Sequence, residues 1–271
     1  MKNDNHYSIL DWMLFGPDDY LDLVKNWEDP NPFPVLVDYD GIVVVRDDLQ
    51  EGGSKVRFAD KLIRDTPVDE FCYGGSNSVG WGNISLAYLC RKYGKIAHSF
   101  YADRKEPTPH QKYYSDLGGK ITWVKMGMLS VTKAHCKKYV EQSPTTRMNV
   151  PIGLEHDITL GAIVKVARNL PIIPEVVWTV GSSGTLTRGL QMAWPDSEFH
   201  CVQTGHKMDQ EEAGNATVHP VSYKYNQPCK EEDLPPFPSA REYDAKVWKP
   251  MKELYNPQKV NLFWNVAGDP K

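Results

Sequence analysis

The chain has 271 residues and a formal net charge of -4, with a sequence pI near 6.1. Hydrophobic residues make up 41% of it and charged residues 24%, values typical of a folded globular protein. This balance excludes a generally basic nucleic-acid-coating protein, although a local basic patch is compatible with it. No apolar run reaches the ~20 residues that a membrane helix needs. The first residues, MKNDNHYSILDW, lack the apolar core of a signal peptide.

The cysteine pattern indicates the compartment. The five cysteines are odd in number, form no CxxC pair and are scattered along the chain: Cys72, Cys90, Cys136, Cys201 and Cys229. Such a pattern is typical of reduced thiols in a cytoplasmic protein and not of a disulfide framework. The histidines show no zinc-ligand spacing, so we expect no metal site.

The first elements in chain order lead to a single lysine. Residues 1–34 are rich in aromatic residues and proline, which predicts an irregular segment packed over the fold. Residues 35–37 and 42–45 are short apolar runs separated by Asp-Tyr-Asp-Gly, which predicts a hairpin. They are followed by Gly-Gly-Ser-Lys, ending at Lys55, and then by a helical pattern from Val56 to Ile63.

Lys55 is the first candidate functional residue. The two glycines before it allow a sharp bend at the mouth of a helix, which can direct the lysine into a cleft. A desolvated amine in such a cleft can form a Schiff base with an aldehyde. The same four residues are more often an ordinary solvated loop, so the assignment depends on motifs further along the chain.

The middle of the chain predicts a parallel sheet. A strand at 69–75, a polar glycine-rich loop at 76–82, a helix that begins with Asn83 as its N-cap and a strand at 95–102 together form a βαβ unit. The other expected elements are helices at 107–114, 131–139 and 160–170, strands at 120–124, 176–180, 199–204 and 260–266, and a helix start at 242–248.

Two further segments have an unusual composition. Residues 205–240 are rich in Gly, Pro and charge, and a long irregular excursion of this kind is often a lid or rim. The helix at 131–139 is basic, which predicts a solvated face or, as the less common case, contact with a phosphate-bearing partner. Its charged residues are Lys133, His135, Lys137 and Lys138.

A second motif follows the strand at 176–180. It is Gly181-Ser182-Ser183-Gly184-Thr185, and a helical pattern comes directly after it. Small residues at a strand-to-helix turn let backbone N–H groups and hydroxyls converge on a phosphate. The motif lacks the lysine of a Walker loop and is not the G-x-G-x-x-G of a dinucleotide site.

The order of these motifs is that of a known family. Gly-Gly-Ser-Lys, the glycine-rich loop before Asn83, residues 181–185 and Glu242-Tyr243-Asp244-Ala245-Lys246 resemble the pyridoxal-phosphate (PLP) enzymes related to the tryptophan synthase β-subunit (fold type II). The nearest branch is that of 1-aminocyclopropane-1-carboxylate (ACC) deaminase and D-cysteine desulfhydrase. The resemblance spans residues 40–268. Compact proteins that resemble this family are also found in bacteriophages.

This resemblance implies an α/β fold of two lobes. Each lobe would have a mostly parallel, twisted sheet flanked by helices, and PLP would bind in the cleft between them. Residues 1–56 and 166–271 would form the large cofactor-binding lobe, and residues 57–165 a smaller mobile lobe. By analogy with the family, we expect a homodimer in the cytoplasm, or in the host cytoplasm if the protein is phage-encoded.

The resemblance also implies roles for individual residues. Lys55 would hold the cofactor as a Schiff base and then act as proton shuttle. Asn83 would hydrogen-bond the phenolic oxygen of PLP, with Asn77 as the alternative. Gly181, Ser182, Ser183, Gly184 and Thr185 would bind the phosphate.

By the same resemblance, the last motif would supply the acidic partner of the cofactor. Asp244 would face the pyridine nitrogen and keep it protonated, which deepens the electron sink. Tyr243 beside it would touch the substrate and take part in catalysis. Ser78 and Trp81 would face the substrate from the glycine-rich loop.

The substrate-binding positions depart from the family pattern. Gly82 stands where the deaminase branch has a substrate-facing serine, Trp81 enters a loop of small residues, and residues 265–268 replace its His-Thr-Gly-Gly. We therefore expect a PLP enzyme of the deaminase or lyase type that labilises an α-carbon bond of an amino acid or amino-acid-like substrate.

Two alternatives remain open. One is a PLP-dependent decarboxylase that acts on an amino-acid-modified thymine in phage DNA, a hypermodification reaction compatible with residues 205–240 and with the basic helix. The other is a relic of the family that acts only as a binding or scaffold protein. The second alternative is disfavoured because Lys55 and Asp244 are both present.

Overall fold

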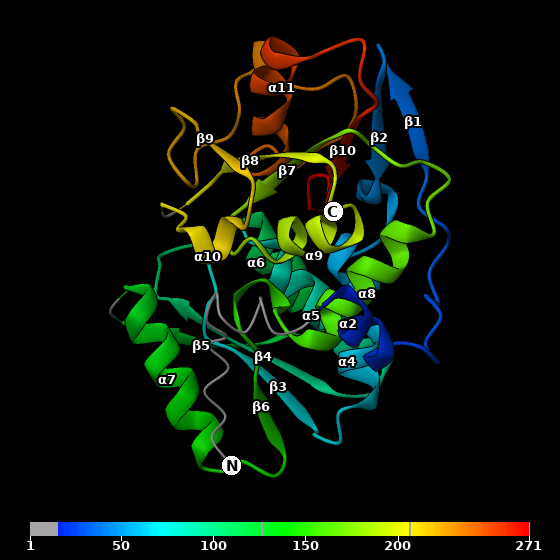
Figure 1. Cartoon of the computed structure of the whole chain (residues 1–271). Helices are drawn as coiled ribbons and strands as arrows, with labels where there is room; N and C mark the ends of the chain where they lie inside the picture. The colour runs from blue at the N-terminus through cyan, green and yellow to red at the C-terminus, as the bar shows by residue number, and fades with distance from the viewer. Residues whose placement is uncertain (1–15, 126, 206, 271) are drawn as a thin grey trace.

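Two β-sheets form the frame of the molecule in the computed structural model, which describes residues 16–125, 127–205 and 207–270 (Figure 1). The larger sheet has the order β1 (Leu36–Tyr39), β2 (Ile42–Arg46), β10 (Asn261–Asn265), β7 (Val176–Gly181), β8 (Glu198–Gln203) and β9 (Thr217–Pro220). The smaller sheet has the order β5 (Lys120–Val124), β4 (Ile96–Ala102), β3 (Glu70–Tyr73) and β6 (Arg147–Asn149). Among these strands only β1 runs antiparallel to its neighbour.

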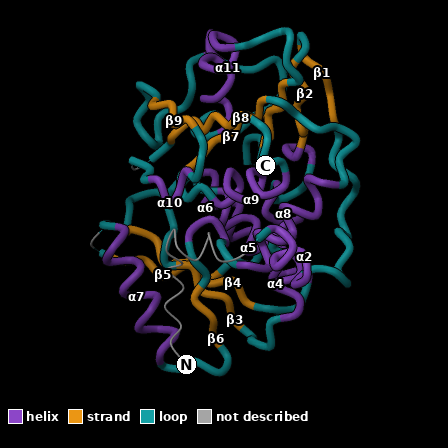
Figure 2. The backbone as a smooth tube through the Cα atoms, viewed as in Figure 1, coloured by secondary structure: helices purple, strands orange, loops and turns teal. Residues whose placement is uncertain are grey.

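Helices fill the space between the sheets and cover their outer faces (Figure 2). They are α2 (Pro17–Leu23), α3 (Ser54–Phe58), α4 (Asp60–Asp65), α5 (Trp81–Lys92), α6 (Pro109–Asp116), α7 (Leu129–Glu141), α8 (Asp157–Arg168), α9 (Thr185–Ala193), α10 (Gln210–Ala213) and α11 (Trp248–Leu254). Helices α5, α8 and α9 lie between the two sheets, and α11 covers the far face of the larger one. Within the described ranges, no helix is long and apolar enough to cross a membrane.

One hydrophobic core connects the two sheets. It includes Val45 and Leu262 of the larger sheet, Leu62 of α4, and Phe71 and Ala97 of the smaller sheet. The strand directions and the covering helices described above confirm the α/β class with mostly parallel sheets. Because burial of apolar surface is the main driving force of folding, this shared core fixes the two sheets relative to each other.

The hairpin at the start of the larger sheet follows the sequence prediction. Strands β1 and β2 pair with Tyr39 opposite Ile42, so that only Asp40 and Gly41 form the loop. Both loop residues have positive φ, 55° and 84°, as a two-residue type I′ turn requires. Helix α5 between the parallel strands β3 and β4 confirms the βαβ unit in the same way.

Two helix starts differ from the prediction. Helix α5 begins at Trp81 with Gly80 as its N-cap, so the assignment of Asn83 as N-cap is wrong. The Asn83 amide is used elsewhere, since it donates to the Ser76 and Ser99 hydroxyls at 2.8 and 2.7 Å. The single helix expected after Lys55 is two short helices, α3 and α4, and Lys55 lies inside the first of them.

The two segments expected to be irregular contain regular elements. Strand β9 and helix α10 lie within residues 205–240, and β9 extends the larger sheet next to β8. Strand β9 escaped prediction because it has only four residues, ends in proline and is half-buried or exposed. Helix α2 lies within residues 1–34, of which residues 1–15 fall outside the described part of the chain.

A buried ion-pair network attaches the N-terminal segment to the core. Arg57 of α3 is 2% exposed and pairs with Asp47 and Asp29, and Asp47 also accepts a hydrogen bond from the Trp264 indole at 2.9 Å. Removing one partner of a buried pair leaves the other charge uncompensated, which is far more costly than losing an exposed pair.

We therefore expect Arg57→Ala to lower the free energy of unfolding by about 3–5 kcal/mol. Urea denaturation measures this loss. The control is Lys25→Ala, which breaks an exposed pair with Asp22 and should cost at most about 1 kcal/mol. Equal losses in the two variants would contradict this interpretation of the network.

Candidate active site

Lys55 is held at the end of β10 by a glycine turn. Gly52 and Gly53 have positive φ, and a Cβ on Gly53 would lie 2.9 Å from the Val266 carbonyl oxygen, so this close approach requires glycine. The Ser54 N–H then donates to that same carbonyl at 2.9 Å. These contacts place Lys55, the second residue of α3, beside the strand end.

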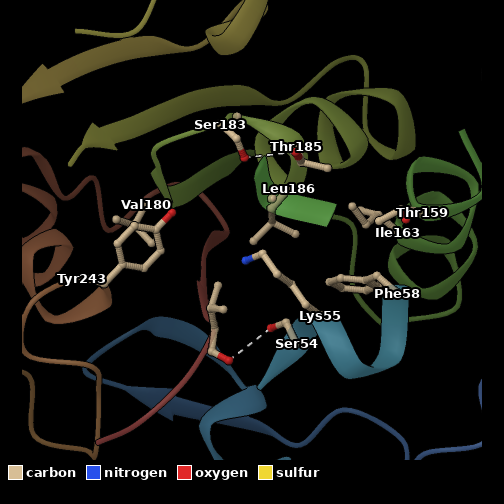
Figure 3. Close-up of a pocket in the computed structure, with 13 residues that line it drawn as sticks. Ser54, Lys55, Phe58, Thr159, Ile163, Val180, Ser183, Thr185, Leu186 and Tyr243 are labelled. Carbon is tan, nitrogen blue, oxygen red and sulfur yellow. Dashed lines mark hydrogen bonds between the residues drawn. The ribbon is translucent and has the colours of Figure 1, made fainter. Parts of the chain in front are cut away.

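The Lys55 side chain enters a pocket between helices α3, α8 and α9. The pocket contains about 420 Å³ of space not filled by atoms, part of it open to solvent. Figure 3 shows the amine pointing toward Leu186, with Ser183 and Thr185 beyond it and Tyr243 on the side opposite Phe58.

The environment of Lys55 favours an uncharged amine. Desolvation lowers its pKa, and the negative charge of Asp244 opposes this only in part. An uncharged amine is the nucleophilic form of lysine.

The loop between β7 and α9 forms the opposite wall. Ser183, Gly184 and Thr185 line the pocket, and the Ser183 and Thr185 hydroxyl oxygens are 3.1 Å apart. Gly184 has φ +67°, and a Cβ there would lie 1.6 Å from the Glu212 carbonyl oxygen, so only glycine fits. The unpaired N–H groups at the start of α9 therefore face a site suited to an anion.

Gly181 and Ser182 lie at the edge of this loop and outside the pocket lining. Gly181 ends β7 against Cys201, because a Cβ there would lie 2.5 Å from the thiol sulfur. The Ser182 hydroxyl is 3.5 Å from the phenol oxygen of Tyr243, which does line the pocket.

Asp244 is a fully buried carboxylate with one oxygen unused. Its Oδ1 accepts a hydrogen bond from the Val266 N–H at 3.1 Å, while Oδ2 has no partner among the described residues. Desolvation raises the pKa of Asp244 to about 7, although the Val266 N–H and the positive charge of Lys55 act in the opposite direction. A buried, unpaired carboxylate oxygen fits a protonated ring nitrogen.

The remaining predicted residues lie in the smaller-sheet half of the molecule. Asn83 is buried in the hydroxyl network already described, and Asn77 accepts a hydrogen bond from the Val79 N–H at 3.0 Å. The Ser78 carbonyl accepts from Thr108, and Trp81 packs edge-on against His110 and Tyr113. The structure places Asn77, Ser78, Trp81 and Asn83 outside the lining of the Lys55 pocket.

Several pocket residues had no signal in the sequence. Thr159 and Ile163 lie one turn apart on α8, and Gly153 precedes that helix in the 3-10 turn Ile152–Leu154. A Cβ on Gly153 would lie 2.2 Å from the Ser183 hydroxyl oxygen, which shows how tightly this turn packs on the loop. In the sequence Ile163 belongs to the apolar helix pattern at 160–170, which is equally consistent with an ordinary core helix, and Gly153 and Thr159 precede that pattern.

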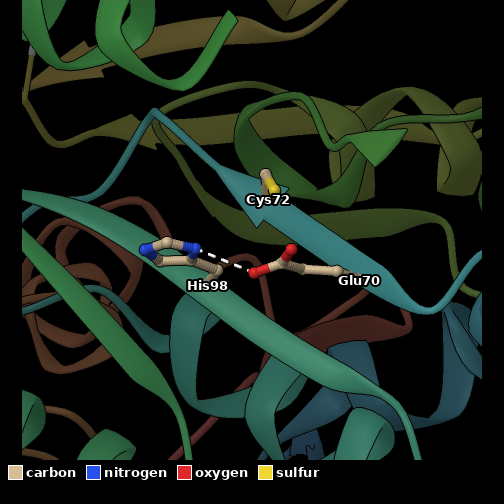
Figure 4. A group of neighbouring side chains, drawn as sticks. All are labelled: Glu70, Cys72 and His98. Carbon is tan, nitrogen blue, oxygen red and sulfur yellow. Dashed lines mark hydrogen bonds and ion pairs between the residues drawn. The ribbon is translucent and has the colours of Figure 1, made fainter. Parts of the chain in front are cut away.

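A second cluster of polar residues lies in the smaller sheet (Figure 4). Ligand-type atoms of Glu70, Cys72 and His98 lie within 4.8 Å of one another. The Glu70 carboxylate already accepts hydrogen bonds from His98, Arg147 and Tyr139 at 2.9, 2.9 and 3.1 Å. Because the arginine already neutralises this carboxylate, we interpret the cluster as a structural network that joins β3, β4, β6 and α7.

The pKa of Asp244 gives a testable pH dependence. A carboxyl group whose pKa rises from 3.8 to about 7 on folding stabilises the folded protein fully below pH 4. This stabilisation is lost as the pH rises through 7. Without cofactor, Asp244→Asn should therefore be more stable than the wild type at pH 8, by on the order of 4 kcal/mol, and equal to it near pH 4.

Urea denaturation at a series of pH values measures this difference. The matched control is Asp65→Asn, because salt bridges lower the pKa of Asp65 to about 2. That carboxylate contributes its stability above pH 4, so its removal should destabilise the protein at pH 8. Equal stability of Asp244→Asn and the wild type at pH 8 would contradict the assigned burial.

The comparisons with known proteins concern the fold. No protein-family model and no curated protein sequence matches the chain. An ACC deaminase homologue of known structure superposes with a TM-score of 0.73 at 13% identity, over 93% of this chain and 95% of that one. Diaminopropionate ammonia lyase from Escherichia coli gives 0.65 at 12% identity, over 95% and 89%. A pyridoxal 5'-phosphate-dependent aspartate racemase gives 0.63 at 11% identity, over 98% and 97%. The chain therefore has the tryptophan synthase β-like (fold type II) fold that the order of its motifs implied.

Proposed function

We propose that this protein is a PLP-dependent enzyme of the deaminase or lyase type, which labilises an α-carbon bond of an amino acid or amino-acid-like substrate. The observation that carries the proposal is that one pocket is lined both by Lys55, whose amine is desolvated, and by the first residues of α9. The fold supports it, since the structures that share it include a PLP-dependent racemase, an ACC deaminase homologue and an ammonia lyase.

The residues present fit this cofactor. Lys55 would bond to its aldehyde, and Ser183, Gly184 and Thr185 would bind its phosphate. Asp244 is not among the described residues that line the pocket, and its free oxygen would accept a hydrogen bond from the protonated ring nitrogen. When bound, PLP supplies an electron sink for charge that develops at the substrate α-carbon. Gly181 and Ser182 would support the phosphate loop, and Asn83, or alternatively Asn77, would reach the phenolic oxygen.

Two side chains of the pocket would handle protons. Lys55, once released by the substrate amine, would move a proton at the α-carbon, and the desolvation that lowers its pKa favours this role as a base. Burial raises the pKa of Tyr243, so this phenol stays protonated and can donate a hydrogen bond to the substrate. Ser78 and Trp81 would reach the substrate only if the loop before α5 moves toward the pocket.

The decarboxylase alternative differs in the bond broken and in the partner. The lysines at 133, 137 and 138 on α7 are exposed, which is compatible with DNA binding. Basic helices are more often solvated surfaces, and none of the described residues that line the pocket belongs to α7. We therefore propose a free amino acid as substrate, a homodimer as the assembly, and residues 57–165 as a lobe that closes over the bound substrate.

A titration of the cofactor-free protein with PLP tests this function. The wild type should develop a visible absorption band with saturation, and amino acids screened against it should release ammonia or a keto acid. Lys55→Ala should lack both the band and the turnover, because no other pocket-lining residue offers an amine.

The control is Lys61→Ala, which changes a lysine on the neighbouring helix α4 that pairs with Asp65 on the surface. It should bind PLP as the wild type does. A Lys55→Ala protein with wild-type band and turnover would rule out the proposed role of Lys55.

A further inference from the structure

One pocket residue is left with an unsatisfied hydroxyl group. Thr159 is 1% exposed and lines the Lys55 pocket, and its hydroxyl oxygen has no hydrogen-bond partner among the described residues (Figure 3). A buried threonine on a helix can usually bond back to a carbonyl of the preceding turn, yet this one does not. Since unpaired buried hydroxyls are unfavourable, the group is best explained by a ligand.

The position of Thr159 indicates which part of a ligand it would meet. It is the third residue of α8 and follows Ile158, whose N–H donates to the His156 ring nitrogen at 3.2 Å, so it lies in the first turn of the helix. Gly153, just before α8, lies against the phosphate loop, because a Cβ there would be 2.6 Å from the Thr185 hydroxyl oxygen. The first turns of α8 and α9 therefore border the same pocket.

The pocket lining also lacks the cations that commonly bind phosphate. Apart from Lys55, none of the described residues that line it is a lysine, arginine or histidine. An anion in this pocket would depend on neutral donors and on the positive ends of helix dipoles. Each individual hydroxyl donor then contributes a larger share of the affinity.

We propose that the Thr159 hydroxyl binds the phosphate group of the cofactor, so that the phosphate site is built from α8 as well as from residues 181–185. The hydroxyl would donate its proton to a phosphate oxygen. This inference rests on the proposed function, because it assigns one further residue to the same cofactor site.

Thr159→Val is the sharpest test, because valine has nearly the same shape and lacks only the hydroxyl. Absorbance titration should show about tenfold weaker PLP binding, since a hydrogen bond to a charged group is lost. Pyridoxal, which has the same aldehyde and no phosphate, should bind the variant and the wild type equally. Thr159→Ser should restore PLP binding.

The stability of the cofactor-free proteins gives an independent readout. Thr159→Val should have an unchanged or higher Tm, because its hydroxyl has no partner to lose. The matched control is Thr187→Val on α9, whose hydroxyl is buried and lies 2.8 Å from the Thr179 hydroxyl. This control should have a lower Tm.

The outcomes separate this inference from the proposed function. If wild type binds PLP and Thr159→Val binds it equally well, the assignment of Thr159 is wrong and the function stands. If the variant loses PLP and pyridoxal to the same extent, the substitution has disturbed the pocket and the phosphate contact is refuted. If wild type binds no PLP, the function and this inference both fail.

Discussion

The backbone of Val266 is the point on which the site depends. Its carbonyl accepts the Ser54 N–H that fixes the start of α3, and its N–H donates to the carboxylate of Asp244. Lys55 and Asp244 are far apart in the sequence, but both are positioned by this one residue at the end of β10. Because β10 lies between β2 and β7 in the larger sheet, these positions are set by the most constrained part of the fold.

Burial gives these two groups their chemistry. Desolvation lowers the pKa of the Lys55 amine and raises that of the Asp244 carboxyl, and each charge partly offsets the shift of the other. The fold therefore maintains a reactive amine and an unsatisfied carboxylate at a cost in stability. Such a cost is expected at a functional site and is recovered when a ligand pairs the buried groups.

Local patterns in the sequence predicted the elements whose geometry is encoded locally. The Asp40-Gly41 turn and residues 181–185 are examples, since a two-residue hairpin and a tight strand-to-helix loop need particular residue types. Thr159 could not be found in this way, because its role depends on how α8 packs beside α9. Val266 acts through its main chain, which has no residue-type signal, and the Asn83 amide binds Ser76 and Ser99 through tertiary contacts.

The most direct test of this account is to identify the lysine that carries the cofactor. PLP-treated protein would be reduced with borohydride, digested and mapped by mass spectrometry. The account predicts a pyridoxyl group on Lys55. Lys246 is the informative competitor, because it is 2% exposed and burial lowers its pKa to about 8. A pyridoxyl group on Lys246, or on no lysine, would contradict the central claim that the turn before α3 presents the reactive amine.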